Sequence, residues 1–466
     1  MLAGDDSASD RLVISGGTAS GVSTIQVNNL GGAGAATTGN GIALVTTSNG
    51  GTTATTAFAI DRAIAAGPYE YLLFRGGTTA GTENNWYLRN NIIAAAPLPA
   101  TPVTFDPAPP SPQPPDPSPP AQPPAPPPFV APTTITPQVI EAAATAPEPI
   151  PLYRPEAAVY SAVPAIARQS ALLIAGTFND RQGDQRLQGG EGFLSSAWGR
   201  ALGQRTEQHW SGDVAPAFDG DVSGLQAGLA LFGRESSSGS HDEAGIFFGY
   251  VRASGNVRGF ALAQPDIGVG SLELESDSAG AYWTHVDSPD WYTDVLVVRS
   301  SFEGEARSLR GLGMDLGGNA LTASVETGHP FAIGRNLLLE PQAQVLFQRL
   351  SLDGGEDVFS SVRFHREDSW IARVGVRLVG AVEGALQIHP YLQANLWHTL
   401  DGNDTVEFSS VPVQTQRGAT ALEFAAGLAA ATSDHFGMYA ALGYTTDLDS
   451  DRHAVLSGNP GIRIAW

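Results

Sequence analysis

From residue 192 to the C-terminus, the chain is a succession of stretches in which polar and apolar residues alternate. Within residues 373–378, Arg373 and Arg377 fall on one face of a strand, because side chains alternate with period two. The opposite face is apolar and carries Val374, Val376 and Leu378. Both a soluble β-sandwich and a β-barrel contain strands of this kind, so the alternation alone leaves these two architectures open.

The connections between the strands distinguish a barrel from a sandwich. We count twelve strands, starting near Phe193, Val222, Ala244, Ser271, Trp291, Asn319, Leu337, Trp370, Leu386, Ala419, Phe436 and Ala454. Long links alternate with short ones, and the long set is 204–221, 255–270, 303–318, 353–368, 401–418 and 447–453. A barrel that crosses a membrane has long loops on one side and tight turns on the other. We therefore predict an all-β fold in which residues 191–466 form a twelve-stranded transmembrane β-barrel. Because the number of strands is even, the beginning and the end of the barrel both lie on the short-turn side.

The end of the chain agrees with this prediction. Ile462, Ile464 and Trp466 share one face of a terminal strand. Termini of soluble proteins are usually frayed and polar, whereas aromatic residues are typical of the membrane interface of a barrel. We expect these three residues to face lipid on the periplasmic side and to close the barrel; the alternative is the last strand of a sandwich.

The composition narrows the functional classes. The chain has no cysteine, which excludes disulfides, thiolate catalysis and Cys-ligated metal sites. A net charge of −22 argues against nucleic-acid binding, which needs a basic surface. No apolar run reaches the roughly 18 residues that a transmembrane helix requires. The start of the chain is acidic and lacks the apolar core of a secretory signal, so we expect a fragment or a truncated product.

Residues 152–190 contain the one stretch that favours a helix, between residues 155 and 180. Pro155 suits a first helical turn, and Pro164 is expected to kink the helix, or to end it and start another. The stretch is rich in small side chains: Ala157, Ala158, Ala162, Ala165, Ala167, Ala171 and Ala175. Such a thin helix suits a plug inside a narrow pore, although a helix docked on a soluble sheet is also consistent.

Residues 97–151 form a proline-rich linker, which holds 22 of the chain's 33 prolines. Extended polyproline II rises about 3.1 Å per residue, so its densest part, residues 97–128, reaches on the order of 100 Å. We expect a spacer that holds one domain away from a surface; binding to a polyproline-recognising domain is the alternative.

Residues 1–96 are rich in Gly, Thr, Asn and Ala, with short β-prone bursts between them. The bursts are 11–14, 23–27, 41–45, 69–74 and 85–88. Glycine and asparagine supply the turns that separate them. Stacked rungs of this kind suit a parallel β-solenoid, and the alternative is a small antiparallel β domain.

Several motifs resemble those of the classical (type V) bacterial autotransporters. In the C-terminal part they are 153–156 (YRPE), 173–183, 197–200 (AWGR), 218–221 (FDGD), 224–228, 281–284 (AYWT), 339–344 (LEPQAQ), 390–398 (PYLQANLWH) and the terminal strand. In the N-terminal part, 12–17 (LVISGG), 27–32 (VNNLGG) and 86–88 (WYL) resemble the end of a pertactin-like passenger. The resemblance implies a twelve-stranded barrel in the outer membrane of a Gram-negative bacterium, an α-helix in its pore, and a short right-handed β-helix fragment of a passenger at the cell surface. A usual precursor also has a signal peptide and a much longer passenger.

A search for chemistry gives no catalytic, cofactor or metal site. The nine histidines are scattered, and neither a His-Glu-x-x-His nor a Gly-x-Ser-x-Gly motif occurs. We therefore expect no enzyme and no cofactor. The candidate functional side chains are arginines that could pair with acids and hold the plug helix: Arg168, Arg200, Arg373 and Arg377. General polarity of a barrel lumen is the alternative explanation for them.

The leading functional hypothesis is an outer-membrane translocator that exports and anchors its own N-terminal passenger. The alternatives are a porin-like channel and a surface adhesin that acts through the passenger remnant. The expected partners are outer-membrane lipid and lipopolysaccharide, the barrel assembly machinery, which would read Ile462, Ile464 and Trp466, and periplasmic chaperones. A longer passenger could also bind a host surface ligand, and no nucleic acid is expected.

Overall fold

The computed structural model describes most of the two terminal parts of the chain. The described residues are 1–92, 140–141, 149–183, 196–236, 240–287, 291–382, 387–400, 402–433, 435–449 and 453–466. The proline-rich linker predicted over 97–151 lies almost wholly outside them, and residues 184–195 lie wholly outside them.

The C-terminal part is a closed antiparallel barrel of twelve strands. Neighbours in sequence are neighbours in space throughout, and the barrel closes where the first strand pairs with the last, Ser196 opposite Ala465. The strands are β13 (Ser196–His209), β14 (Ala217–Glu235), β15 (His241–Ala261), β16 (Gln264–Asp287), β17 (Trp291–Ser308), β18 (Gly313–Gly328), β20 (Leu337–Leu352), β23 (Glu367–Gly380), β24 (Gln387–Thr399), β27 (Ala419–Ser433), β28 (Phe436–Asp447), and a last strand in two pieces, β29 (His453–Gly458) and β30 (Gly461–Ala465). A short β19 (Phe331–Gly334) forms a hairpin with the start of β20.

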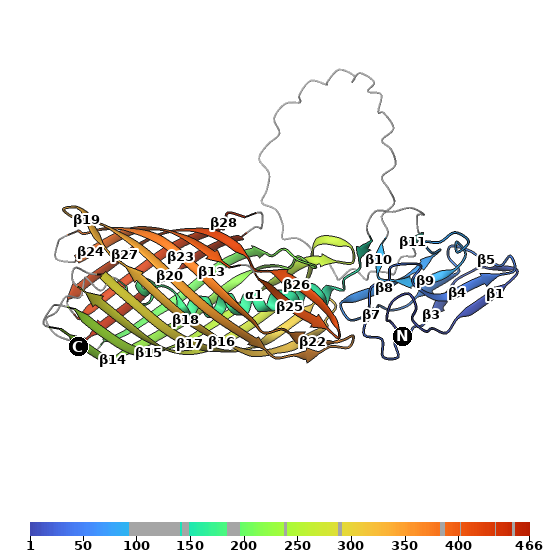
Figure 1. Cartoon of the computed structure of the whole chain (residues 1–466), viewed down its shortest axis with the longest axis horizontal. Coiled ribbons are helices and arrows are strands. Elements are labelled where there is room, and N and C mark those ends of the chain that lie inside the picture. Colours follow the sequence, from blue (N-terminus) through green and yellow to red (C-terminus); the bar gives the residue numbers. More distant parts are fainter. Residues whose placement is uncertain are drawn as a thin grey trace, which may run out of the picture.

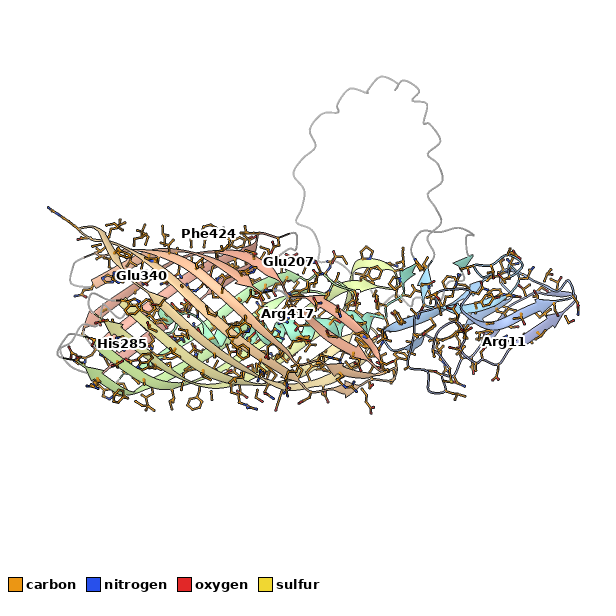
Figure 2. The ribbon with its side chains drawn as sticks, viewed as in Figure 1. Arg11, Glu207, His285, Glu340, Arg417 and Phe424 are labelled. Carbon is orange, nitrogen blue, oxygen red and sulfur yellow. The ribbon has the colours of Figure 1, made fainter. Side chains whose placement is uncertain are left out.

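The faces of the barrel are reversed relative to a soluble protein. Large apolar side chains project outward, as Phe424 on β27 does with 53% of its surface exposed (Figure 2). Others in the same band are Leu225, Phe248, Trp370, Leu392 and Leu442. Buried polar side chains such as Gln348 and Arg373 point inward. This distribution is the one that a lipid environment selects.

The predicted long loops are wrong in part, because strand continues through three of them. The links actually observed there are 210–216, 262–263 and 309–312. Strands reach 24 residues in β16, whereas about 9–11 residues cross a membrane. The extensions carry polar pairs that point outward, such as Arg252 with Glu273. Because polar residues are typical of loops, the sequence pattern predicts loops at these positions. Two long links, 353–366 and 400–418, do hold additional structure: β21 (Gly355–Glu356), β22 (Ser361–Phe364), β25 (Asn403–Phe408) and β26 (Val411–Gln416), which form one small sheet.

Inside the barrel, bulky rings lie over glycines of neighbouring strands. A Cβ on Gly461 would lie 2.2 Å from Cζ of Tyr439, and one on Gly228 would lie 2.4 Å from the ring of Trp198. Tyr282 over Gly245, Phe247 over Gly280 and Tyr292 over Gly328 repeat the arrangement. The glycines therefore make the space that lets large aromatic residues pack flat against the inner wall.

The helix lies inside this barrel (Figure 1). α1 (Pro155–Ala175) is continuous through Pro164, so the prediction that Pro164 separates two helices is wrong. The break comes at Gly176, which has φ of 53°, and α2 (Phe178–Gln182) follows with a capping box formed by Thr177 and Asp180. α1 is long and apolar enough to cross a membrane by itself, yet most of it is buried against the barrel wall.

The N-terminal part begins with two stacked rungs. β1 (Leu12–Ser15), β2 (Thr18–Ala19) and β3 (Ser23–Ile25) pair in parallel with β4 (Ile42–Ser48), β5 (Thr52–Thr53) and β6 (Phe58–Ile60). After them, β7 (Ile64–Ala66), β8 (Tyr69–Arg75) and β9 (Trp86–Arg89) are antiparallel. The parallel rungs predicted from the bursts are therefore confirmed for residues 12–60, and antiparallel pairing governs residues 64–89.

The chain returns to this N-terminal domain immediately before it enters the barrel. β12 (Ile150–Pro151) pairs with β10 (Asn91–Ile92), and β11 (Ile140–Glu141) pairs with β8. The described residues that flank most of the proline-rich segment are therefore side by side, so the length of this segment does not set the distance between the domain and the barrel. The spacer predicted over residues 97–151 itself lies almost wholly outside the described residues. The domain sits directly at one mouth of the barrel, and the C-terminus lies at the opposite end (Figure 1).

Replacing Gly461 with alanine should lower the free energy of unfolding by about 1–3 kcal/mol, because the ring of Tyr439 must move within a packed interior. Urea unfolding of the purified protein in lipid vesicles measures the change. Gly203→Ala is the matched control on the adjacent strand, since a Cβ there meets nothing within 4 Å. Equal losses in the two variants would show that Tyr439 does not need the glycine.

Candidate functional site: the pore and its helix

The pore is occupied by α1, which lies against β15, β16, β17 and β18 rather than on the barrel axis. All its alanines except Ala165 are buried, among them Ala158, Ala162 and Ala167. The wall facing them carries glycines: a Cβ on Gly259 would lie 2.6 Å from that of Ala158, and one on Gly249 would lie 2.5 Å from Cδ1 of Ile174. Small residues on both surfaces thus allow the helix and the wall to approach closely. The sequence shows these glycines, but only the strand register shows that they face the helix.

Arg200 caps the C-terminal end of α1. Its guanidinium donates to the backbone carbonyls of Leu173 (3.0 Å) and Ile174 (3.2 Å) and to Oε1 of Gln226 (2.6 Å). The last carbonyls of a helix have no partner within the helix and carry partial negative charge, so a cation stabilises them.

Arg168 extends from α1 towards the outer end of the pore. It donates to Oδ1 of Asp404 on β25 at 3.0 Å and to the carbonyl oxygen of Glu367 at 2.9 Å. β25 and β26 belong to the small sheet over the mouth, and that sheet reaches across to the β13–β14 link, where Gln414 donates from its backbone to Asp213. The helix is therefore connected through Arg168 to the structure that covers the mouth.

Arg373 and Arg377 lie on the inner wall near the C-terminal end of α1. Arg373 forms a fully buried ion pair with Glu326 (3.0 Å) and donates to Gln344 (2.9 Å). These two partners, and not Arg373 itself, contact the helix region: Glu326 accepts from the backbone of Phe178, and Gln344 donates to the carbonyl of Gly176. Arg377 donates weakly to Asn179 at 3.4 Å and lies 4.1 Å from the ring centroid of Tyr391.

Sequence reasoning missed the side chains that hold α2. Arg181 forms a buried ion pair with Asp294, and its carbonyl accepts from the hydroxyl of Tyr439 at 2.8 Å. Gln182 accepts from Arg463 at 2.8 Å, and Arg463 also pairs with Glu243 at 2.7 Å. The alternation around Ile462 and Ile464 places Arg463 on the inner face, and that was the only available signal. The pairing partners come from distant strands, which no local pattern identifies.

The three terminal residues lie on the outer face of the barrel. Ile462, Ile464 and Trp466 expose 47%, 44% and 58% of their surfaces. They alternate with the inward Arg463 and Ala465, at the end of the barrel that also carries α2.

Part of the lumen beside α1 is open. A cavity of about 350 Å³ lies between the helix and the wall formed by β13, β24, β27, β28 and β29. Its lining mixes apolar side chains such as Leu172 and Val455 with polar ones such as Gln169, Gln204 and Glu423. Among the described residues, no group of three or more His, Asp or Glu side chains is arranged to hold a metal ion. The described lumen therefore holds a helix and, beside it, an open space.

At the mouth beside the N-terminal domain, three parts of the chain meet at one arginine. Arg310, in the β17–β18 link, pairs with Glu70 of the N-terminal domain and with Glu156 at the start of α1, each at 2.6 Å. Although burial alone would lower the pKa of Arg310, these two carboxylates raise it. Burial raises the pKa of Glu70, and Arg310 offsets only part of that rise.

The comparisons with known proteins identify the family. A model described as the autotransporter beta-domain matches residues 197–443. The chain belongs to the autotransporters. A second model, described as the autochaperone domain type 1, matches residues 1–73 of this autotransporter.

Two curated relatives and one solved structure agree with this assignment. The adhesin BmaC autotransporter of Brucella suis is 26% identical over 100% of this chain, and the pertactin autotransporter of Bordetella bronchiseptica is 28% identical over 57% of it. The chain spans only 13% and 28% of the lengths of these two relatives. The transport unit of the autotransporter AIDA-I from Escherichia coli has the same fold, with a TM-score of 0.56 and 18% identity over 67% of this chain and 100% of that chain.

Membership in this family places the barrel in the outer membrane of a Gram-negative bacterium, with its N-terminal domain on the cell surface. The short turns, α2 and Trp466 then lie on the periplasmic side. This is the orientation predicted from the links, and it follows here from the position of the N-terminal domain at the opposite mouth (Figure 1).

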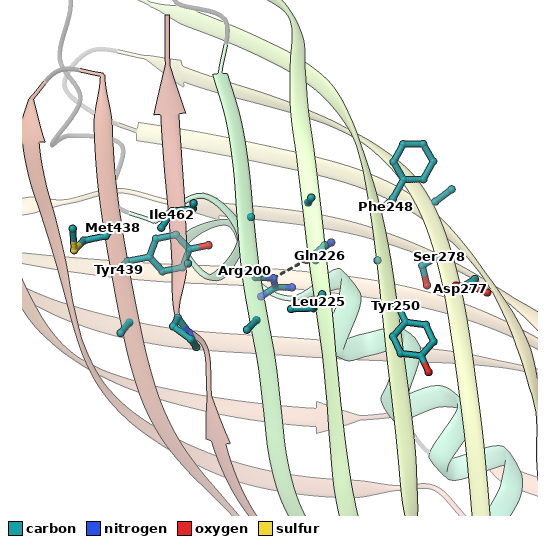
Figure 3. Close-up of a pocket in the computed structure, with 18 of the residues that line it drawn as sticks. Arg200, Leu225, Gln226, Phe248, Tyr250, Asp277, Ser278, Met438, Tyr439 and Ile462 are labelled. Carbon is teal, nitrogen blue, oxygen red and sulfur yellow. Dashed lines mark hydrogen bonds between the residues drawn. The ribbon is translucent and has the colours of Figure 1, made fainter.

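The lipid-facing wall of the autotransporter barrel has a shallow hollow of about 1250 Å³ around its closing strands (Figure 3). Small residues such as Ala201, Ala227 and Ala440 form part of its lining, next to Phe248 and Ile462. Figure 3 also shows the bond from Arg200 to Gln226 behind this wall.

Arg373→Met should lower the free energy of unfolding of the barrel by about 3–5 kcal/mol, because it leaves the buried carboxylate of Glu326 without its counter-ion. Urea unfolding in lipid vesicles measures this loss. Arg349→Gln is the control, since it removes an exposed pair with Asp368 and should leave the unfolding curve where it was. A loss no larger than that of the control would show that Glu326 is neutral or compensated elsewhere.

Proposed function

We propose that the barrel exports the N-terminal part of its own chain and then retains it at the cell surface, with α1 as the last segment to enter the pore. The observation that carries this proposal is the path of the chain. It runs from the folded domain at one mouth, through the lumen as α1 and α2, and into the wall at the opposite end. A polypeptide with this path has its N-terminal part on one side of the membrane and its barrel within the membrane.

Folding of the N-terminal domain outside the cell would supply the direction of transport. The domain buries large apolar side chains, among them Phe58, Tyr71 and Trp86. An extended chain inside the pore exposes these residues, and folding removes them from water, which makes return through the pore unfavourable. The likeness of residues 1–73 to an autochaperone domain supports this role.

The plug would form when export is complete. Buried ion pairs and hydrogen bonds from the wall meet the backbone of residues 173–182, through Arg200, Glu326, Gln344 and Tyr439. In this role Arg168, Arg200, Arg373 and Arg377 position the plug, directly or through their partners, and perform no chemistry. We accordingly propose that the chain has no catalytic activity and uses no cofactor.

The partners of such a protein would include the lipid and lipopolysaccharide of the outer membrane. In addition, we propose that periplasmic chaperones keep the unfolded chain soluble and that the barrel assembly machinery recognises Ile462, Ile464 and Trp466. Their outward position at the periplasmic end leaves them accessible before the barrel closes. The relative named as an adhesin suggests that a longer passenger would bind a host surface ligand.

A porin-like channel is the second candidate function, and the cavity beside α1 favours it. That space lies beside the helix and carries polar and charged side chains such as Gln204, Arg417 and Glu423 among its apolar ones. α1 stands against continuous conduction, since it occupies the lumen and packs against β25 and β26 of the small sheet at the mouth.

Conductance in planar lipid bilayers separates these two functions. The intact chain should remain close to its closed level, and deletion of residues 155–182 should produce a steady open conductance, because it removes the helices that occupy the lumen. Circular dichroism establishes that the deleted variant keeps its β content. A large, steady conductance of the intact chain would favour the porin-like channel instead.

Trp466→Asp should reduce insertion of the barrel into outer membranes, because a charge replaces an interfacial aromatic at the proposed recognition end. Heat-modifiable mobility of outer-membrane fractions measures the folded barrel. Trp466→Phe is the control and should insert at close to the wild-type level. If the aspartate variant also inserts at that level, Trp466 has no part in assembly.

A further inference from the structure

The contact between the N-terminal domain and the barrel is built around buried charge. Nη1 of Arg310 donates to Oε2 of Glu70 at 2.6 Å, and Nη2 donates to Oε2 of Glu156 at 2.6 Å. The side chains of Glu70 and Glu156 expose 10% and 0% of their surfaces. One barrel arginine thus holds a carboxylate of the folded domain and a carboxylate of the first turn of α1 together.

A second arginine continues this cluster. Arg154, fully buried, donates to the carbonyl of Gly67 (2.7 Å) in the domain and to Asp357 (2.6 Å) in the barrel. Its own backbone N–H donates to the carbonyl of Pro68 at 2.9 Å. Tyr160 of α1 donates to the same Asp357 at 3.3 Å. Both arginines therefore touch the domain and the barrel, and the helix shares their acidic partners.

Aromatic residues pack beside these charges. Tyr69 of the domain stacks on Tyr153 with ring centroids 5.2 Å apart, and Tyr153 meets Phe260 of β15 edge-on at 6.3 Å. The carbonyl of Tyr153 also accepts from the backbone of Leu262 at 2.8 Å. The contact therefore combines apolar packing with ion pairs, and it lies along residues 67–70 of the domain.

From these contacts we propose that the folded N-terminal domain is a clamp that docks on the mouth of the barrel and holds the pore helix in its plugged position. The proposal rests on the proposed function, since it concerns how the plug of the translocator is held. The segment that docks on the mouth of the barrel is the folded hairpin that contains residues 67–70.

The geometry makes plugging conditional on folding. Glu70 and Gly67 belong to the β7–β8 hairpin, and their positions are set by antiparallel pairing within the domain, Ala66 opposite Tyr69. An unfolded segment does not present both groups to Arg310 and Arg154. The cluster is therefore completed only after the last part of the passenger has folded outside, and completion fixes the start of α1.

Removing the carboxylate on the domain side tests this clamp in the full-length chain. Glu70→Gln leaves the pair between Arg310 and Glu156 intact but removes the ion pair between Arg310 and the domain. We expect the fraction of time that the pore is open in planar bilayers to rise roughly tenfold, and the amides of α1 to exchange with solvent faster, because the start of the helix loses the charged part of its contact with the domain. Arg349→Gln, which removes an exposed pair on the same side of the barrel, should match the wild type in both measurements.

A second variant tests the clamp from the barrel side. Arg310→Gln should have an effect at least as large as Glu70→Gln, and the double variant should be no worse than Arg310→Gln alone, since both substitutions break one contact. Wild-type opening and exchange in Glu70→Gln, or additive effects in the double variant, would overturn the proposal. Should Glu70→Gln fail to fold, Arg310→Gln decides by the same two measurements.

The outcomes also separate this inference from the translocator function itself. A permanently open wild-type chain contradicts the plug, whatever the variants do. A closed wild-type chain whose variants remain closed and slow in exchange contradicts only the clamp.

Discussion

The structure depends on one constraint: within lipid, every backbone N–H and C=O must find a partner in the protein. Twelve antiparallel strands meet this demand only if the first pairs with the last, and the pairing of β13 with β29 and β30 does so. Closure then defines an inside and an outside. Apolar side chains go to the outside, and the polar ones that share their strands are forced into a lumen that the chain itself must fill.

The need to fill that lumen explains which side chains line the inner wall. Glycines opposite Ala158 and Ile174 bring the helix close, and rings such as Tyr439 fill the space over other glycines. The charges that remain inside, such as those of Arg373 and Glu326, are paired because an unpaired charge there is strongly unfavourable. The lumen is thus solid on the side of β15–β18 and open on the opposite side.

Periodicity predicted the faces well, because it depends only on neighbouring residues. The inward position of Arg373 and the outward position of Trp466 both follow from alternation. The partners of these residues depend on the register between strands, which the sequence does not display. Strand extensions above the membrane were read as loops because their outward residues are charged, as with Arg252 and Glu273. α1 continues through Pro164 because packing against the wall outweighs the loss of one backbone hydrogen bond.

Asn91 and Ile92 pair with Pro151 and Ile150, and this pairing defines the place of the proline-rich segment in the fold. It is an insertion within a folded domain and not a tether between two domains. The position of the domain relative to the barrel is set instead by the contacts of residues 67–70 with Arg154 and Arg310, which do not depend on the length of that insertion.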